Sequence, residues 1–134
     1  MAKEAFKKIE EIEAWNKARV VAKLIWEVSS EGTFAKDFSL KDQINRAAGS
    51  VMDNIAEGFG RGGNKEFSNF LSIARGSAQE VKSQIYRTYD RNHLDEATFK
   101  KLLELSVQSI ISVHSLFNTV NTSDYDGSKF KDRR

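Results

Sequence analysis

The chain has 134 residues, no cysteine, no proline and a formal net charge of +2, from 21 Lys and Arg against 19 Asp and Glu. This length predicts one domain, and the missing cysteine excludes disulfide scaffolds, thiolate zinc sites and cysteine nucleophiles. The small net charge excludes a histone-like polycation. Because charges interrupt every segment that might form a secretory signal or a membrane span, we expect a cytoplasmic protein without membrane contact.

The first two segments carry apolar residues at every third or fourth position, which is the spacing of one helix face. A first helix is predicted at about residues 12–29, and its stripe contains Ile12, Trp15, Ala18, Ala22, Ile25 and Val28. A second is predicted at about 39–59, with Ser39 as N-cap and Asp42 three residues on. Its stripe contains Leu40, Ile44, Ala47, Val51 and Ile55.

The clearest break in the chain is the run from Gly58 to Gly63, which holds four of the eight glycines. A third helix follows at about 65–90, with Asn64 as N-cap. A fourth is predicted at about 95–121, with Asp95 as N-cap. Both continue the helical spacing, through Phe67, Leu71, Ala74, Ala78, Val81 and Ile85 in the third and Phe99, Leu103, Ile110, Val113, Phe117 and Val120 in the fourth.

No segment alternates with the period of a strand, and short linkers between long helices favour antiparallel neighbours. We therefore predict an all-α fold, an antiparallel up-down-up-down four-helix bundle in a single domain over residues 1–121. The polar residues 122–134 are predicted to form a mobile C-terminal tail. Small residues around Ala48 and Gly76 lie equally far from the midpoint of the second hairpin, so we expect the second and third helices to be closest there.

The fourth helix has an apolar face too wide for a single neighbour, and Trp26 lies off the main stripe of the first helix. Both features favour a homo-oligomer with a subunit interface. The alternative is a thick intramolecular core with Trp26 lying flat on the surface.

Catalytic patterns are scarce. His93 and His114 lack the spacing of a helix-borne zinc site, no Glu has His three positions later, and the glycine run lacks the Gly-Lys-Ser/Thr ending of a phosphate-binding loop. No serine lies in Gly-x-Ser-x-Gly. We therefore expect a protein that is not an enzyme and has no cofactor or metal, with His114 a packed or interfacial residue.

Nucleic-acid binding is the stronger functional hypothesis. Arg61 and Lys65 lie on either side of Gly62-Gly63, where the chain enters a helix N-terminus, a position that favours phosphate. Arg46 and Arg75 lie on the second and third predicted helices. These four residues are the predicted phosphate contacts. One alternative is a solvated face on which arginines pair with acids, for example Arg61 with Glu57. Another is a protein-binding scaffold that uses the apolar surface of the fourth helix.

Residues 43–48 and 54–61 resemble the signature of the four-helix bundle family named for 23S ribosomal RNA intervening sequences. The matching positions include Asn54, Glu57, Gly58, Gly60 and Arg61. The likeness continues through Lys65-Glu66-Phe67 and Gly76-Ser77, and upstream through Ala14-Trp15. It covers roughly residues 9–120.

The resemblance implies a ring-like homo-oligomer, commonly a pentamer, whose biochemical role is mostly unassigned. Distant relatives are the accessory variability proteins of diversity-generating retroelements, which bind reverse transcriptase and nucleic acid. The family offers no catalytic role for Asn54, Glu57, Gly58 or Gly60, so structural roles are expected for them. Together these points predict an accessory factor that binds RNA, DNA or a nucleic-acid enzyme such as a reverse transcriptase.

Overall fold

The computed structural model describes residues 6–132, and side chains as far as residue 122. Within this range the chain forms four α-helices, α1 (Glu13–Ser29), α2 (Phe38–Gly60), α3 (Asn64–Asp90) and α4 (Glu96–Asp132), and two 3₁₀ turns, η2 (Ile9–Glu11) and η3 (Phe34–Lys36). This part of the chain contains no strand, so the all-α prediction is confirmed. None of its helices is long and apolar enough to cross a membrane.

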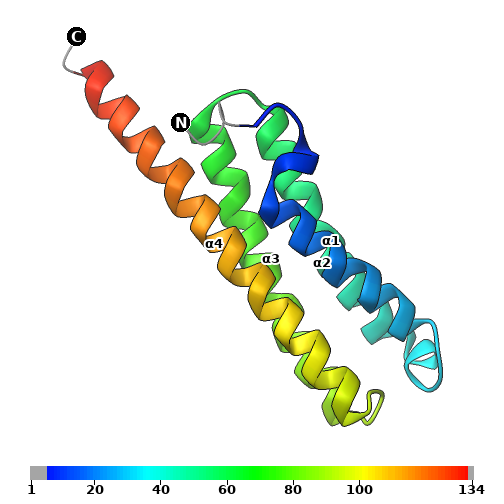
Figure 1. Ribbon diagram of the computed structural model, residues 1–134. Coiled ribbons are helices and arrows are strands. Elements are labelled where there is room, and N and C mark those ends of the chain that lie inside the picture. The colour runs from blue at the N-terminus through cyan, green and yellow to red at the C-terminus, as the bar shows by residue number, and fades with distance from the viewer. Residues whose placement is uncertain (1–5, 133–134) are drawn as a thin grey trace.

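Figure 1 shows the arrangement of the four helices, and their buried side chains form one apolar core. Each helix contributes buried residues at three- and four-residue steps, as the hydrophobic spacing predicts. Fully buried side chains include Ile25, Phe34, Leu40, Ile44, Ile55, Phe67, Leu71, Ile85, Leu102 and Val113. Since each large apolar side chain contributes about 1.5–3 kcal/mol on burial, this core is the main source of stability.

Helices that are consecutive in the sequence pack on each other, and α4 also packs on α1. Along the α2–α3 pair, Gln43 contacts Arg87 and Ser50 contacts Ser77. Residue numbers therefore fall along α3 as they rise along α2. One end of the bundle brings the α1–α2 connection beside the α3–α4 connection, as Figure 1 shows.

Two predicted N-caps are wrong and one is confirmed. α2 begins at Phe38, capped by Asp37, whose Oδ1 accepts from the Leu40 N–H at 3.4 Å, and not by Ser39. α3 begins at Asn64, with Gly63 as N-cap and no side-chain cap. Asp95 does cap α4, where its Oδ1 accepts from the Thr98 N–H at 2.7 Å.

α4 is longer than predicted. It continues to Asp132, beyond the expected end at residue 121 and beyond its neighbours in Figure 1. The stretch 122–132 contains no proline, and its single Gly127 costs only about 1 kcal/mol in a helix, so a polar composition alone does not end α4. The predicted tail is therefore helical over this stretch. Its mobility stays a prediction, and residues 133–134 lie outside the described residues.

The small residues around Ala48 and around Gly76 do meet, as predicted, but not through Ala48 and Gly76 themselves. That α2 and α3 are closest at this point stays a prediction. Ala48 is buried, but Gly76 is exposed and no atom of another helix lies within 4 Å of the position its Cβ would take. Counting residues from the middle of the α2–α3 connection predicts nearly the right height of each residue along the helix axis. It does not predict which side of the helix the residue faces. The small residues that meet are Ser50 and Ser77, whose hydroxyls are 2.9 Å apart.

Candidate nucleic-acid interface

Two of the predicted phosphate contacts, Arg46 and Arg61, lie on α2 and its C-cap with their side chains exposed. Each forms an ion pair with an acid one turn earlier: Arg46 Nε is 3.0 Å from Asp42 Oδ2, and Arg61 Nε is 3.1 Å from Glu57 Oε2. The Arg61–Glu57 pair is the alternative that the sequence left open. Because exposed pairs of this spacing contribute only about 0.3–0.5 kcal/mol, they do not prevent either arginine from binding another anion.

Arg61 and Lys65 lie on either side of the short α2–α3 connection. The turn needs a glycine at Gly62, whose φ is +97°. Gly63 is the N-cap of α3 and provides no side-chain cap. The amides of the first turn and the positive end of the helix dipole therefore lie beside Lys65, which is exposed. Arg61 also stacks on Phe70, with 5.1 Å from its guanidinium carbon to the ring centroid.

The structure separates Arg75 from these residues. Arg75 faces α4, where its guanidinium lies 4.1 Å from the centroid of Phe117 and 3.4 Å from Nδ1 of His114. α2 instead meets α3 through residues such as Ser77. Only Arg61 and Lys65 therefore lie at the same connection. Arg46 lies about 22 Å away along α2, and Arg75 faces α4.

The signature residue Asn54 joins α2 to α3 through a chain of hydrogen bonds. Its Nδ2 donates to the carbonyl of Ser50 at 2.8 Å and to the Ser50 hydroxyl at 3.0 Å, and that hydroxyl is bonded to Ser77. All three side chains are partly buried. Asn54 therefore has a structural role, since it orients Ser50 toward α3.

The two signature glycines differ from each other. Gly58 is a buried residue inside α2, and a Cβ there would lie 2.7 Å from Phe70 Cβ and 3.3 Å from Phe67 Cα. No such contact exists for Gly60, the last residue of α2. Only Gly58 is required for the close approach of α3 to α2, and neither glycine makes the turn.

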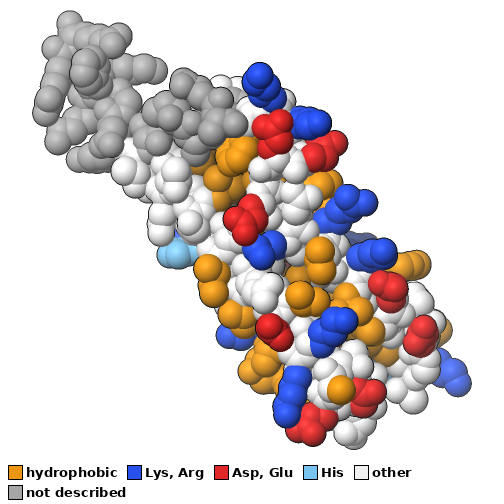
Figure 2. Space-filling view, viewed as in Figure 1, with side chains coloured by type: hydrophobic (Ala, Val, Ile, Leu, Met, Phe, Trp, Pro, Cys, Tyr) orange, Lys and Arg blue, Asp and Glu red, His pale blue; other side chains and the backbone are white. Residues whose placement is uncertain are grey.

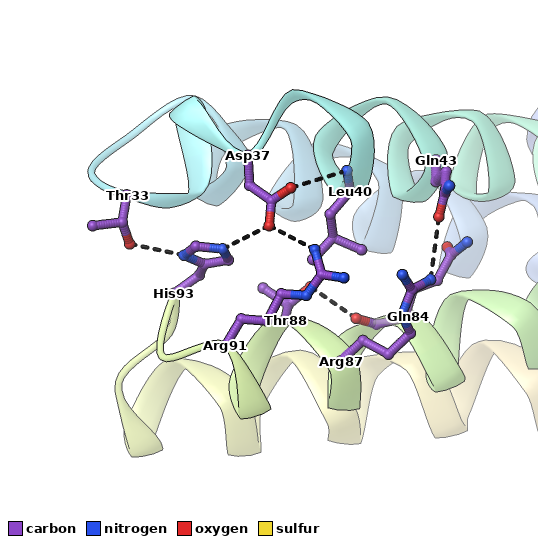
Figure 3. Close-up of polar contacts among 9 residues, drawn as sticks. All are labelled: Thr33, Asp37, Leu40, Gln43, Gln84, Arg87, Thr88, Arg91 and His93. Atoms are coloured by element: carbon purple, nitrogen blue, oxygen red, sulfur yellow. Dashed lines mark hydrogen bonds and ion pairs between the residues drawn. The ribbon is translucent and has the colours of Figure 1, made fainter.

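A dense polar cluster lies at the opposite end of the bundle from the glycine connection, and the sequence did not predict it. In Figure 3, Asp37 at the start of α2 accepts from His93 Nε2 at 2.9 Å and from Arg91 Nη1 at 2.8 Å. Nδ1 of His93 lies 2.8 Å from the Thr33 hydroxyl. The imidazole also stacks on Phe34 with centroids 5.5 Å apart. These contacts tie the two helix connections together.

This cluster stabilises the ionised form of Asp37. The hydrogen bond from His93, followed by that from Arg91, lowers the pKa of the Asp37 carboxyl from 3.8 to about 2. The sequence carries one sign of the cluster, an acid at a helix start. The partner lies 56 residues further on, and no local pattern links the two positions.

Elsewhere in the described part of the chain, the titratable side chains are dispersed. On the face in Figure 2, Lys and Arg alternate with Asp and Glu, so no patch of a single sign covers it. Among the described residues no group of three or more His, Asp or Glu side chains is placed to hold a metal ion. The arrangement at the α2–α3 connection can bind anions electrostatically, but it offers no nucleophile and base in contact.

Comparison with known proteins agrees with this architecture. No curated protein sequence matches the chain. The family model described as 23S rRNA-intervening sequence protein matches residues 10–113, which include α1, α2, α3 and most of the packed part of α4. The match contains Asn54, Glu57, Gly58 and Gly60. The chain therefore belongs to the 23S rRNA-intervening sequence protein family.

Proposed function

We propose that the protein is a non-enzymatic accessory factor that binds RNA or DNA, or a nucleic-acid enzyme such as a reverse transcriptase. In this proposal the chain is an antiparallel up-down-up-down bundle that assembles with itself in the cytoplasm as a ring-like homo-oligomer, with a pentamer favoured. Arg46, Arg61, Lys65 and Arg75 contact phosphate. The proposal involves no cofactor and no membrane.

The observation that supports it most directly is the exposure of the cations around the α2–α3 connection. The Arg61 side chain is 50% exposed and Lys65 follows it at an uncapped helix N-terminus. Arg46, further along α2, is 81% exposed. Phosphate groups bind such sites through charge and backbone amides without reading base sequence.

Self-assembly would multiply this weak field. A net charge of +2 on one chain becomes about ten around a pentamer, and every basic residue is repeated about the axis. The exposed apolar side chain of Ile111 and the uncharged stretch 105–123 of α4 around it supply a surface for such assembly. A monomer would have neither the repeated charge nor a use for this surface.

The test is binding to mixed-sequence RNA and DNA over a series of salt concentrations. Affinity should fall steeply with salt, and the triple variant Arg46→Gln, Arg61→Gln, Lys65→Gln should bind more weakly and with a shallower slope, by about 0.7–0.9 for each phosphate that is no longer neutralised. The matched control removes three exposed lysines elsewhere, Lys23, Lys100 and Lys101. No binding at low salt would contradict nucleic-acid binding. Equal weakening in both triple variants would contradict only the assigned residues.

A second candidate, a protein-binding scaffold without nucleic-acid affinity, is favoured by a different observation. A groove of about 520 Å³ runs between α1 and α4, lined by apolar residues such as Phe6, Ile12 and Leu116. It continues to Ile111, whose side chain is 63% exposed. Retained oligomeric mass with no nucleic-acid binding at any salt concentration would favour the scaffold.

A further inference from the structure

A second groove lies between α3 and α4, on the other side of Ile111. Its volume is about 570 Å³, within the range of small-molecule sites. It is lined by polar residues from both helices and by an apolar wall; the residues used below are Arg75, Gln79, Ile110, Ile111, His114 and Asn118.

Arg75 is held in this groove without an acidic partner. Its guanidinium lies over Phe117, with 4.1 Å from its carbon to the ring centroid, and this contact holds the side chain in place. Among the described residues no carboxylate forms an ion pair with Arg75, in contrast to Arg46, Arg61 and Arg91, which each have one. The charge of Arg75 is therefore oriented and locally uncompensated.

His114 and Asn118 extend the donor set. Arg75 can only donate, so the contact of its Nη1 with His114 Nδ1 at 3.4 Å makes Nδ1 an acceptor. The other nitrogen, Nε2, then carries the proton and lies 3.2 Å from the amide of Asn118, which accepts through its oxygen after an amide flip. An anion entering beside Arg75 would meet the guanidinium and the Nδ2 of Asn118, and it would gain the imidazole N–H by displacing the Asn118 oxygen from it.

The surrounding sequence keeps negative charge away. Residues 105–123 of α4 contain no Asp, Glu, Lys or Arg. No acidic residue lines the groove in the described part of the chain. Ile110 and Ile111 give it an apolar side next to this positive centre. The groove therefore combines the features that recognise a phosphate attached to an apolar or aromatic group.

We propose that the α3–α4 groove binds a phosphate monoester of nucleotide size, with its phosphate at Arg75 and His114 and its organic group against Ile110. Gln79 and Asn118 supply hydrogen bonds at the rim. The proposal goes beyond nucleic-acid binding because a free phosphate monoester needs no strand, although both proposals use Arg75.

The experiment is calorimetric titration of the intact protein with AMP and with adenosine, together with the imidazole C–H resonances of its two histidines. AMP should bind about 10- to 100-fold more tightly than adenosine, because adenosine cannot accept the charge-assisted hydrogen bonds that the phosphate accepts. AMP should shift the resonance of His114, identified by its absence in His114→Gln, and leave that of His93 in place.

Variants locate the site. Arg75→Gln should weaken AMP binding about 10- to 100-fold and His114→Gln about 2- to 10-fold. Arg75→Lys keeps the charge but loses the planar guanidinium, so its affinity for AMP should lie between those of the wild type and Arg75→Gln. The matched control is Arg19→Gln. Arg19 is an exposed arginine on α1 stacked on Trp15 at 5.9 Å, outside the groove, and this variant should bind AMP as wild type does.

Several outcomes would overturn the inference: no AMP binding by the wild type up to about 10 mM, equal affinity for AMP and adenosine, or wild-type affinity in both Arg75→Gln and His114→Gln. If Arg75→Gln does not fold, the affinity of His114→Gln and the comparison of AMP with adenosine still test whether the groove binds the phosphate. RNA binding without AMP binding contradicts this inference alone. AMP binding without RNA or DNA binding contradicts nucleic-acid binding alone.

Discussion

At the level of single residues, the family signature contains two glycines with different physical roles. Gly58 allows Phe67 and Phe70 of α3 to approach the backbone of α2, whereas Gly60 faces open space. A sequence cannot separate them, because both lie in the same Gly-rich run. The difference arises from where the helix turns each position, which only the packed structure defines.

The variant Gly58→Ala should destabilise the fold by about 1–3 kcal/mol, because the new methyl would lie 2.7 Å from a Cβ atom and beside backbone. Gly60→Ala, in the same helix, should be neutral or stabilising by up to about 1 kcal/mol, since alanine favours a helix and meets no neighbour. Urea unfolding of both variants measures this. Equal stabilities would show that Gly58 is not a contact residue.

Asp37 is the residue at which stability should respond to acid. Its folded pKa of about 2 lies below the ordinary 3.8, so the stabilisation is present above pH 4 and is lost as the pH falls toward 2. Asp37→Asn should therefore lower the melting temperature at neutral pH, and the difference from wild type should shrink toward pH 2. Thermal melts from pH 7 to pH 2 measure it.

The control for this change is Asp53→Asn, at an exposed position of α2, which removes a carboxylate without touching the cluster. Its melting temperature should follow that of the wild type across the same range. A difference for Asp37→Asn that stays constant down to pH 2 would contradict the role of the His93 and Arg91 hydrogen bonds.

These residues also show what a sequence can predict at this scale. The Glu57–Arg61 pair is predictable because residues four apart on a helix are neighbours. The Asp37–His93 bond is not, because it joins two connections separated by 56 residues. The separation of Arg75 from Arg46 escapes prediction for a related reason, since both arginines lie on predicted helices but the sequence does not show which neighbour each one faces.

At the level of elements, hydrophobic spacing predicts the existence and approximate range of all four helices. Their ends are harder to predict because neighbouring residues compete as caps: Asp37 takes the role expected of Ser39. The end of α4 differs from the prediction because a polar stretch resembles a tail even where, as here, it contains no strong helix breaker. Hydrophobic periodicity identifies the buried face of a helix, and it carries no information on residues that extend beyond the core.

α3 contains one polar atom whose burial is uncompensated. Gln84 is 4% exposed, and its Oε1 is the one buried side-chain oxygen or nitrogen without a hydrogen-bond partner among the described residues. Gln84→Met should stabilise the protein by about 1 kcal/mol, because it replaces an unsatisfied carbonyl with an apolar group of similar volume. Chemical unfolding measures it, with Gln79→Met, at an exposed position of the same helix, as control. A lower stability of Gln84→Met would mean that its weak bond to Glu80 matters more.

At the level of the whole molecule, the middle of α4, residues 105–123, distinguishes this bundle from a self-contained one. Its outer face carries the exposed Ile111 between two grooves, and no charged residue interrupts it from 105 to 123. The sequence predicts a wide apolar face on this helix. It does not predict that the side chain of Ile111 points outward. Because Ile111 is exposed, this face is our candidate for contact between subunits.

Ile111→Glu should therefore reduce the oligomeric mass while leaving the helical content unchanged, because the side chain is 63% exposed in the single chain. A charge buried at an interface costs far more than the same charge in water. Val20→Glu, at a 51% exposed position of α1, is the matched control and should keep the wild-type mass. Sedimentation velocity of the two variants measures this, and an unchanged mass for Ile111→Glu would remove α4 from the interface.

Whether the bundle assembles at all is decided by the absolute mass of the protein alone, measured by light scattering after size-exclusion chromatography. One chain has a mass of 15.2 kDa. We expect a homo-oligomer, with a pentamer at about five times that value, because only repetition turns a net charge of +2 into a field that attracts nucleic acid. A single species of 15.2 kDa at all concentrations would contradict assembly and, with it, the proposed function.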